Sequence, residues 1–126
     1  MGYGTYREIV GFGISFPYPD KKKFVFSRNH TNNENFPVEF IDSDIGTFIN
    51  KLKKGLGKDI WLVGGGQING LFLDADLIDE MIVSIVPAVL GAGIPLFSHS
   101  TGSKRFRISQ CRNFDHTLVQ ITYIRR

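Results

Sequence analysis

The sequence of 126 residues is poor in cysteine and contains no long hydrophobic run. Its one cysteine, Cys111, excludes an internal disulfide and a zinc site built from cysteines. A single thiol also suits a reducing compartment, so we expect a cytoplasmic protein. No apolar stretch approaches the roughly 20 residues that cross a bilayer, and the first residues lack the pattern of a signal peptide. We therefore expect no membrane partner.

An excess of charge of either sign is also absent. Fifteen Lys and Arg stand against 12 Asp and Glu, which leaves a net charge of +3. That balance permits anionic ligands but is far from the strongly basic character of nucleic-acid-binding proteins, so we expect no nucleic-acid partner. Apolar residues are plentiful, at 42% with 11 Phe, which is enough for a core dense in aromatics. The length fits a single domain over residues 1–126.

Glycine and proline divide the chain into short elements that alternate between helix and strand. Apolar spacing predicts three helices: over 5–10, from Asp42 or Ser43 to the stop at Gly55, and over 67–73. It predicts strands over 24–26, 38–41, 60–63, 81–90, 106–114 and 117–124. This order predicts an α/β fold, with a mostly parallel sheet, helices on both faces and an antiparallel C-terminal hairpin.

Local signals refine this outline. Thr5 and Glu8 have the spacing of a capping box, in which each side chain bonds the other's free N–H at a helix start. The run Lys21–Lys23 is interpreted as a solvated entry to a strand rather than as a binding patch. Cys111 is expected to be a small packing residue on a strand.

The most informative segment is Ile60–Val63, which runs into Gly64–Gly66 and then a helix. Its unbroken apolar character predicts a strand covered on both faces, with Trp61 in the core. Three glycines before a helix allow a phosphate to approach backbone N–H groups, and the helix dipole favours that charge. The pattern matches neither the Rossmann fingerprint nor a Walker loop. Alone, it fits anion binding and close packing of helix on sheet equally well.

Ser27 and Arg28 follow a different predicted strand. Because the carboxyl ends of parallel strands meet at one edge of a sheet, this pair is expected to face the same crevice as Gly64–Gly66. A hydroxyl beside a forked guanidinium suits a ribose 2′-phosphate. Arg28 taken alone would be read as an ordinary surface arginine. Taken with the glycines, it favours the phosphate.

Several sequence blocks occur in a characteristic order: Met1–Tyr6, Val25–Arg28, Ile60–Gln67, Leu77–Glu80, Ile85–Pro87, Leu90–Phe97 and Val119–Tyr123. Together they resemble the dihydrofolate reductase superfamily, and more closely its branch of riboflavin-biosynthesis reductase domains with their uncharacterised relatives. The resemblance implies a dihydrofolate-reductase-like fold. It also implies an NADPH-dependent oxidoreductase that transfers hydride to a pterin-like or pyrimidine substrate.

Carried over by position, the resemblance implies a set of cofactor-binding residues: Gly2, Thr5, Ser27, Arg28, Gly64, Gly65, Gly66, Gln67 and Ile68. The last five would hold the pyrophosphate and the adjoining ribose. Ser27 and Arg28 would lie near the adenosine 2′-phosphate, and Gly2 and Thr5 would bring the first helix to the phosphates. The resemblance also implies that a cis peptide can join Gly64 to Gly65, and that Pro95–Phe97 form a sheet edge supporting a homodimer.

Two departures from the family pattern matter. Tyr3 stands where the family usually has an arginine, which removes one expected phosphate contact. The family also has a strand and loop before its Met-Gly pair, and this sequence starts at that pair. We expect either a fragment, an internal methionine of a longer protein, or a chain that has lost the segment and its catalysis.

No catalytic residue is assigned from the sequence. Asp79 and Glu80 are interpreted as capping or solvated carboxylates, and Asp74 and Asp76 as loop residues. The three histidines, His30, His99 and His116, are interpreted as surface residues with no metal-site spacing. Three hypotheses stay open: a reductase completed by an upstream segment, a nucleotide-binding module without turnover, and a structural module whose open sheet pairs with another chain.

Overall fold

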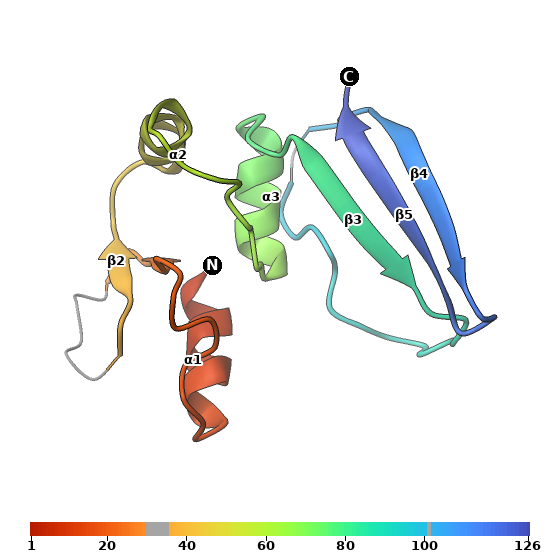
Figure 1. Ribbon diagram of the computed structural model, residues 1–126, viewed down its shortest axis with the longest axis horizontal. Coiled ribbons are helices and arrows are strands. Elements are labelled where there is room, and N and C mark those ends of the chain that lie inside the picture. Colours follow the sequence, from red (N-terminus) through yellow and green to blue (C-terminus); the bar gives the residue numbers. More distant parts are fainter. Residues whose placement is uncertain (30–35, 101) are drawn as a thin grey trace.

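The computed structural model describes residues 1–29, 36–100 and 102–126. In chain order its elements are α1 (Tyr3–Gly11), β1 (Phe24–Phe26), β2 (Glu39–Ile41), α2 (Ile45–Lys54), α3 (Gly66–Asp74), β3 (Glu80–Ile85), β4 (Phe106–Phe114) and β5 (Leu118–Arg125). Figure 1 shows α3 between two regions: α1, α2 and β2 lie on one side of it, and β3, β5 and β4 on the other.

The first region is built on the parallel pair β1–β2, in which Phe24 lies beside Glu39 and Phe26 beside Ile41. The first two residues run along the other side of β1. Gly2 bridges Phe26 in parallel, and the Phe26 N–H donates to the Met1 carbonyl oxygen at 2.9 Å. The carboxyl end of β1 therefore lies directly beside the start of α1.

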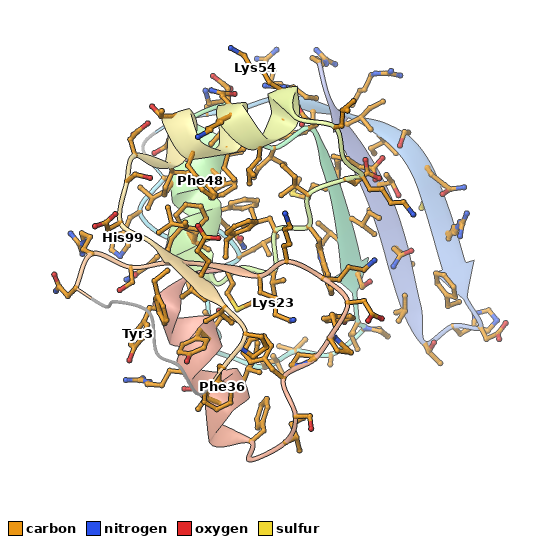
Figure 2. The ribbon with its side chains drawn as sticks, turned by 60° about the vertical axis from the view of Figure 1, so that its left-hand side comes forward. Tyr3, Lys23, Phe36, Phe48, Lys54 and His99 are labelled. Atoms are coloured by element: carbon orange, nitrogen blue, oxygen red, sulfur yellow. The ribbon has the colours of Figure 1, made fainter. Side chains whose placement is uncertain are left out.

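Helices cover both faces of this pair, as predicted. Because side chains alternate along a strand, Val25 faces one way while Phe24 and Phe26 face the other. Val25 is fully buried in a cluster with Tyr6 of α1. Phe26 meets Phe48 of α2 and Phe72 of α3, with ring centroids 5.8 and 5.7 Å apart. Figure 2 shows Phe48 beneath α2 and Tyr3 on α1, on opposite sides of the strands.

The second region is an antiparallel sheet with the order β3–β5–β4. Its turn at Asp115 and His116 has φ values of 42° and 61°, the left-handed pair that suits the twist of a tight hairpin. The register shifts between Ile108 and Gln110, which inserts one extra residue into β4. The predicted C-terminal hairpin is thus confirmed, with β3 added on the far side of β5.

The α/β fold class is confirmed, but the parallel part is smaller than predicted. Among the described residues only β1 and β2 form a parallel ladder between strands, whereas three strands are antiparallel. Residues 60–63 belong to neither sheet, and Trp61 is 65% exposed. An apolar run needs a neighbouring strand on at least one side to become a sheet strand, and no described strand lies there. The strand predicted over 81–90 is β3, which ends at Ile85 and is not buried.

Several local predictions were also wrong. α1 begins at Tyr3 with Gly2 as its N-cap, so Thr5 lies inside the helix and forms no capping box. α2 is capped by Asp44, whose carboxylate accepts the Thr47 N–H at 2.8 Å. Lys23 is buried, with its ammonium on the Lys21 carbonyl oxygen at 3.0 Å and near the Phe16 ring. Cys111 is exposed on β4.

Candidate functional site

The starts of α1 and α3 meet at one place, which we call the glycine junction: Gly2–Thr5 together with Gly64–Ile68. The Gly2 N–H donates to the Gly64 carbonyl oxygen at 2.9 Å. A Cβ added to Gly65 would lie 3.5 Å from the Thr5 hydroxyl, and one added to Gly2 would lie 3.5 Å from the Ile68 side chain. The structure therefore brings together most of the residues assigned to the cofactor from the sequence, although residues 6–63 separate the two parts in the chain.

Both helices present an uncapped N-terminus to this junction. Their N-cap residues are Gly2 and Gly65, which have no side chain to bond the first-turn N–H groups, and neither helix has an acidic residue in its first turn. The first helical hydrogen bond of α1 runs from the Tyr6 N–H to the Gly2 carbonyl oxygen, and that of α3 runs from the Asn69 N–H to the Gly65 carbonyl oxygen. The N–H groups before those points have no intrahelical acceptor, and each helix start carries a partial positive charge. Two such ends in contact form a natural place for an anion.

The three consecutive glycines do different things. Gly64 has φ of +102°, a region that L side chains rarely adopt, and its peptide bond to Gly65 is cis, as the resemblance implies. Gly66 serves packing, because a Cβ there would collide with the Pro95 carbonyl oxygen and the Ser98 hydroxyl. The Ser98 N–H also donates to the Gly66 carbonyl oxygen at 2.9 Å. Close packing thus explains Gly66, and the anion site stays a prediction for Gly64 and Gly65.

Residues 95–98 hold α3 in place, and the sequence reasoning missed this. The Asn69 side-chain amide donates to the Leu96 carbonyl oxygen at 2.9 Å, and the same amide lies against Gly64. Gly70 lets Ser98 approach one turn further along α3. A polar Asn on a mainly apolar helix, with glycine four residues before and one after it, was the available signal. The expected sheet edge at Pro95–Phe97 was wrong, since these residues form no strand.

Ser27 and Arg28 lie next to the junction. Phe26, the residue before them, is the one that bridges Gly2. The Ser27 N–H donates to the Ile41 carbonyl oxygen at 3.0 Å, which fixes the backbone as it leaves β1, and Arg28 is exposed. The carboxyl end of β1 therefore lies at the start of α1, whereas the shared parallel sheet from which the sequence analysis argued is absent among the described residues.

The backbone of Tyr3, which stands in place of the family's arginine, is part of the junction, but its side chain belongs to the core. Its ring centroid lies 5.9 Å from that of Tyr6 and 6.4 Å from that of Phe40. It packs with the cluster around Val25. An aromatic side chain at this position contributes to stability, and no cation is supplied there.

Three carboxylates in the second half of the chain, those of Asp74, Asp76 and Asp79, are engaged in structure. The hydrogen bond from Lys53, together with the charges of Lys53 and Arg125, holds the pKa of Asp79 below its ordinary value. An acid with a lowered pKa is a poor proton donor at neutral pH. Asp76 pairs with Lys104 at 2.9 Å, and Asp74, the last residue of α3, accepts the Ser100 hydroxyl at 2.7 Å.

The described part of the chain shows no metal centre, and its two histidines lie in exposed segments. His99 is exposed and His116 lies in the β4–β5 turn. His30 lies outside the described residues. Within residues 1–29, 36–100 and 102–126, no three His, Cys, Asp or Glu side chains gather in a way that could hold a metal ion. Over the same ranges no helix is both long and apolar enough to span a membrane.

The fold and the junction define a dihydrofolate-reductase-like α/β protein of the riboflavin-biosynthesis reductase branch. The chain belongs to the RibD C-terminal domain family, whose family model matches residues 19–120. A crystal structure of a Shewanella sp. PV-4 protein named for riboflavin biosynthesis has the same fold. Its TM-score is 0.87 at 30% identity, over 100% of this chain and 72% of that one.

Two relatives from Bacillus subtilis (strain 168) bear names that state no activity. The uncharacterized protein YwjB is 34% identical over 125 residues, which are 99% of this chain and 71% of YwjB. The uncharacterized protein YyaP is 43% identical over 103 residues, which are 82% of this chain but only 54% of YyaP. The chain thus spans about half of one of these relatives and less than three quarters of the other.

Proposed function

We propose that this chain is the nucleotide-binding part of an NADPH-dependent oxidoreductase that transfers hydride to a pterin-like or pyrimidine substrate. The observation that carries the proposal is the glycine junction, where two uncapped helix starts meet within hydrogen-bonding contact of each other. A pyrophosphate is the part of a dinucleotide that such a site fits best, because it offers several anionic oxygens to converging N–H groups. Membership of the RibD C-terminal domain family supports the same class of reaction.

The preference for NADPH over NADH rests on Ser27 and Arg28. These residues leave β1 beside Gly2, so we expect the hydroxyl and the guanidinium to reach the adenosine ribose of a dinucleotide whose pyrophosphate binds at the junction. A guanidinium binds a phosphate through two parallel charge-assisted bonds, which a bare 2′-hydroxyl cannot replace.

When bound, the nicotinamide would supply the hydride, and the chain's own residues would hold and orient the cofactor. The described carboxylates Asp74, Asp76 and Asp79 are occupied by structural partners. The second candidate function is therefore an NADP-binding module without turnover of its own. The specific observation in its favour is that none of those three carboxylates is placed as a proton donor at the junction.

The test is a titration of the purified protein with NADPH and with NADH, followed by tryptophan fluorescence. Trp61 is the single tryptophan, lies three residues before Gly64, and meets the Tyr18 ring at a centroid distance of 5.2 Å. We expect saturable quenching that is tighter for NADPH. A folded protein that binds neither cofactor would contradict the proposal. Substrate-dependent oxidation of bound NADPH would separate the enzyme from the binding module.

The variant Arg28→Ala tests the selectivity. Loss of a charge-assisted phosphate contact worth about 1.5–3 kcal/mol should weaken NADPH roughly 10- to 100-fold, with NADH almost unchanged. Arg112→Ala, which removes an exposed arginine from β4, is the matched control and should leave both affinities as they were. Equal losses of NADPH and NADH on changing Arg28 would remove the argument for the 2′-phosphate.

A further inference from the structure

A cavity lined by cationic side chains lies at the opposite end of α3 from the glycine junction. A cavity of about 140 Å³ opens where the C-terminal end of α3 meets the start of β4 and the end of β5. Figure 1 shows the end of β5 and the start of β3 at this same end of the molecule. α3 has nine residues, so about 13 Å of helix separates the cavity from the junction. The cavity therefore belongs to a different site.

The lining of this cavity is strongly basic. Lys104, Arg105, Arg125 and Arg126 line it, against a single carboxylate, Asp76. Arg125 is also paired with Asp79 beside the cavity, so the four cations face two carboxylates and an excess of two positive charges remains. This local excess favours the approach of an anion.

Two of the four cationic side chains form ion pairs with carboxylates, and the other two form none among the described residues. Lys104 bonds both oxygens of Asp76 at 2.9 Å, and Arg125 bonds Asp79 and the Asp76 carbonyl oxygen. In the described part of the chain no ion pair engages Arg105 or Arg126. Each has a forked set of donors suited to a phosphate. The fixed pair shapes the rim, and the remaining pair is available to a ligand.

The end of α3 does not oppose an anion here as strongly as an open helix end would. The Asp76 N–H donates to the Leu73 carbonyl oxygen at 3.2 Å, and the Leu77 N–H donates to that of Phe72 at 2.9 Å. These bonds occupy carbonyl groups that would otherwise point their negative ends outward. Apolar side chains form the rest of the lining: Leu73, Ile78 and Phe106.

We propose that this cavity binds the phosphate group of a small anionic ligand, independently of the cofactor at the glycine junction. The volume is far above the roughly 10–15 Å³ that one water needs, and it accommodates a tetrahedral oxyanion. The apolar lining favours a phosphate monoester whose organic part covers Phe106. Free phosphate shares the same charged contacts, so the experiment compares the two sources.

The test is a two-dimensional amide NMR titration of the whole chain with inorganic phosphate and, separately, with phenyl phosphate at low ionic strength. We expect saturable shifts at residues 104–106 and 125–126, distinct from any shifts at Gly65–Ile68. The double variant Arg105→Gln, Arg126→Gln should weaken binding at the first set at least about tenfold. Tighter binding of phenyl phosphate identifies an ester as the ligand, and equal binding identifies free phosphate.

The matched control is Arg7→Gln with Arg112→Gln, which removes the same charge from two exposed arginines outside the cavity. The dissociation constant obtained from the shifts at residues 104–106 should stay within about twofold of that of the original chain, since distant exposed charges are screened. Phosphate shifts confined to the glycine junction would overturn the cavity proposal and leave the proposed function standing. Equal loss in both double variants would also overturn it, because net charge alone would then explain the binding.

Discussion

The two regions of this molecule are stabilised in different ways. All eight buried hydrophobic residues among those described lie between Tyr6 and Leu77, and six of them belong to the helices and the parallel pair. From residue 78 onward no described side chain is buried, and the sheet β3–β5–β4 is held mainly by its own ladders. The first region therefore positions the glycine junction on a packed core, while the second offers a sheet whose side chains still face solvent.

One face of that sheet is apolar from edge to edge. Met81, Tyr123 and Ile108 form one cross-strand row, and Val83, Ile121 and Cys111 form the next. Ile108 is 62% exposed and none of the others is buried. An apolar sheet face in this state favours association with another surface. The comparison teaches that a packed core supports the junction in a chain whose other region leaves apolar surface exposed.

The largest expected difference between the two regions is in the stability lost when one isoleucine in each is truncated to alanine. Ile49→Ala removes a side chain that is 3% exposed in the cluster with Ile68 and Phe72, and should cost about 2–5 kcal/mol in the free energy of unfolding. Ile108→Ala, on the exposed sheet face, should cost under about 1 kcal/mol. Urea denaturation of both variants measures the difference. Similar losses at the two positions would contradict the division into a packed and an unpacked region.

A second prediction concerns the apolar face of the sheet. Replacing Ile85 and Ile108 by Thr keeps β-branched residues in the strands but makes this face polar. If the face drives self-association into the homodimer that the family resemblance implies, the double variant should sediment as a smaller species at a concentration where the original chain associates. Ile82→Thr, on the opposite face of β3, is the control and should change the sedimentation little. The same behaviour in both variants would exclude this face as the contact.

The smallest effect is expected where the two regions are tied together by ion pairs. Asp79 joins Lys53 of α2 to Arg125 of β5. Its folded-state pKa is lowered from 3.8, so the pair stabilises the folded chain above that pH and is lost as pH falls through the lowered value. Because Asp79 is 58% exposed, solvent screening limits the contribution to under about 1 kcal/mol. Asp79→Asn should match the original chain in acid and be slightly less stable at pH 7, as thermal unfolding at both pH values would show. Unequal stabilities in acid but equal ones at pH 7 would contradict it.

Local periodicity was enough to predict most of the elements. The spacing of Ile45, Phe48 and Ile49 predicted the buried face of α2, and the short turn at Asp115 and His116 predicted the hairpin. These features depend on neighbours in sequence. The N-cap of α2 was missed by one residue because Asp42, Ser43 and Asp44 all have side chains that can cap a helix.

What could not be predicted depends on partners distant in sequence. Residues 60–63 have the composition of a buried strand, but composition does not say which strand lies beside them, and none of the described strands does. The role of Gly66 depends on Pro95 and Ser98, about thirty residues away. The convergence of Gly2 and Thr5 with Gly64 and Gly65 was foreseen only through the family resemblance, since no local pattern links positions so far apart.

The central claim is that the start of α3 receives the cofactor's phosphates, and the variant Gln67→Glu tests it most directly. Gln67 is exposed in the first turn of α3, so the isosteric change adds a carboxylate near the positive end of the helix dipole. The dipole stabilises this negative charge, whereas a bound phosphate is repelled by it. We predict unchanged or slightly higher stability together with about tenfold weaker NADPH binding, while Gln110→Glu on β4 leaves binding unchanged. A stable Gln67→Glu protein that binds NADPH as tightly as the original chain would contradict the account.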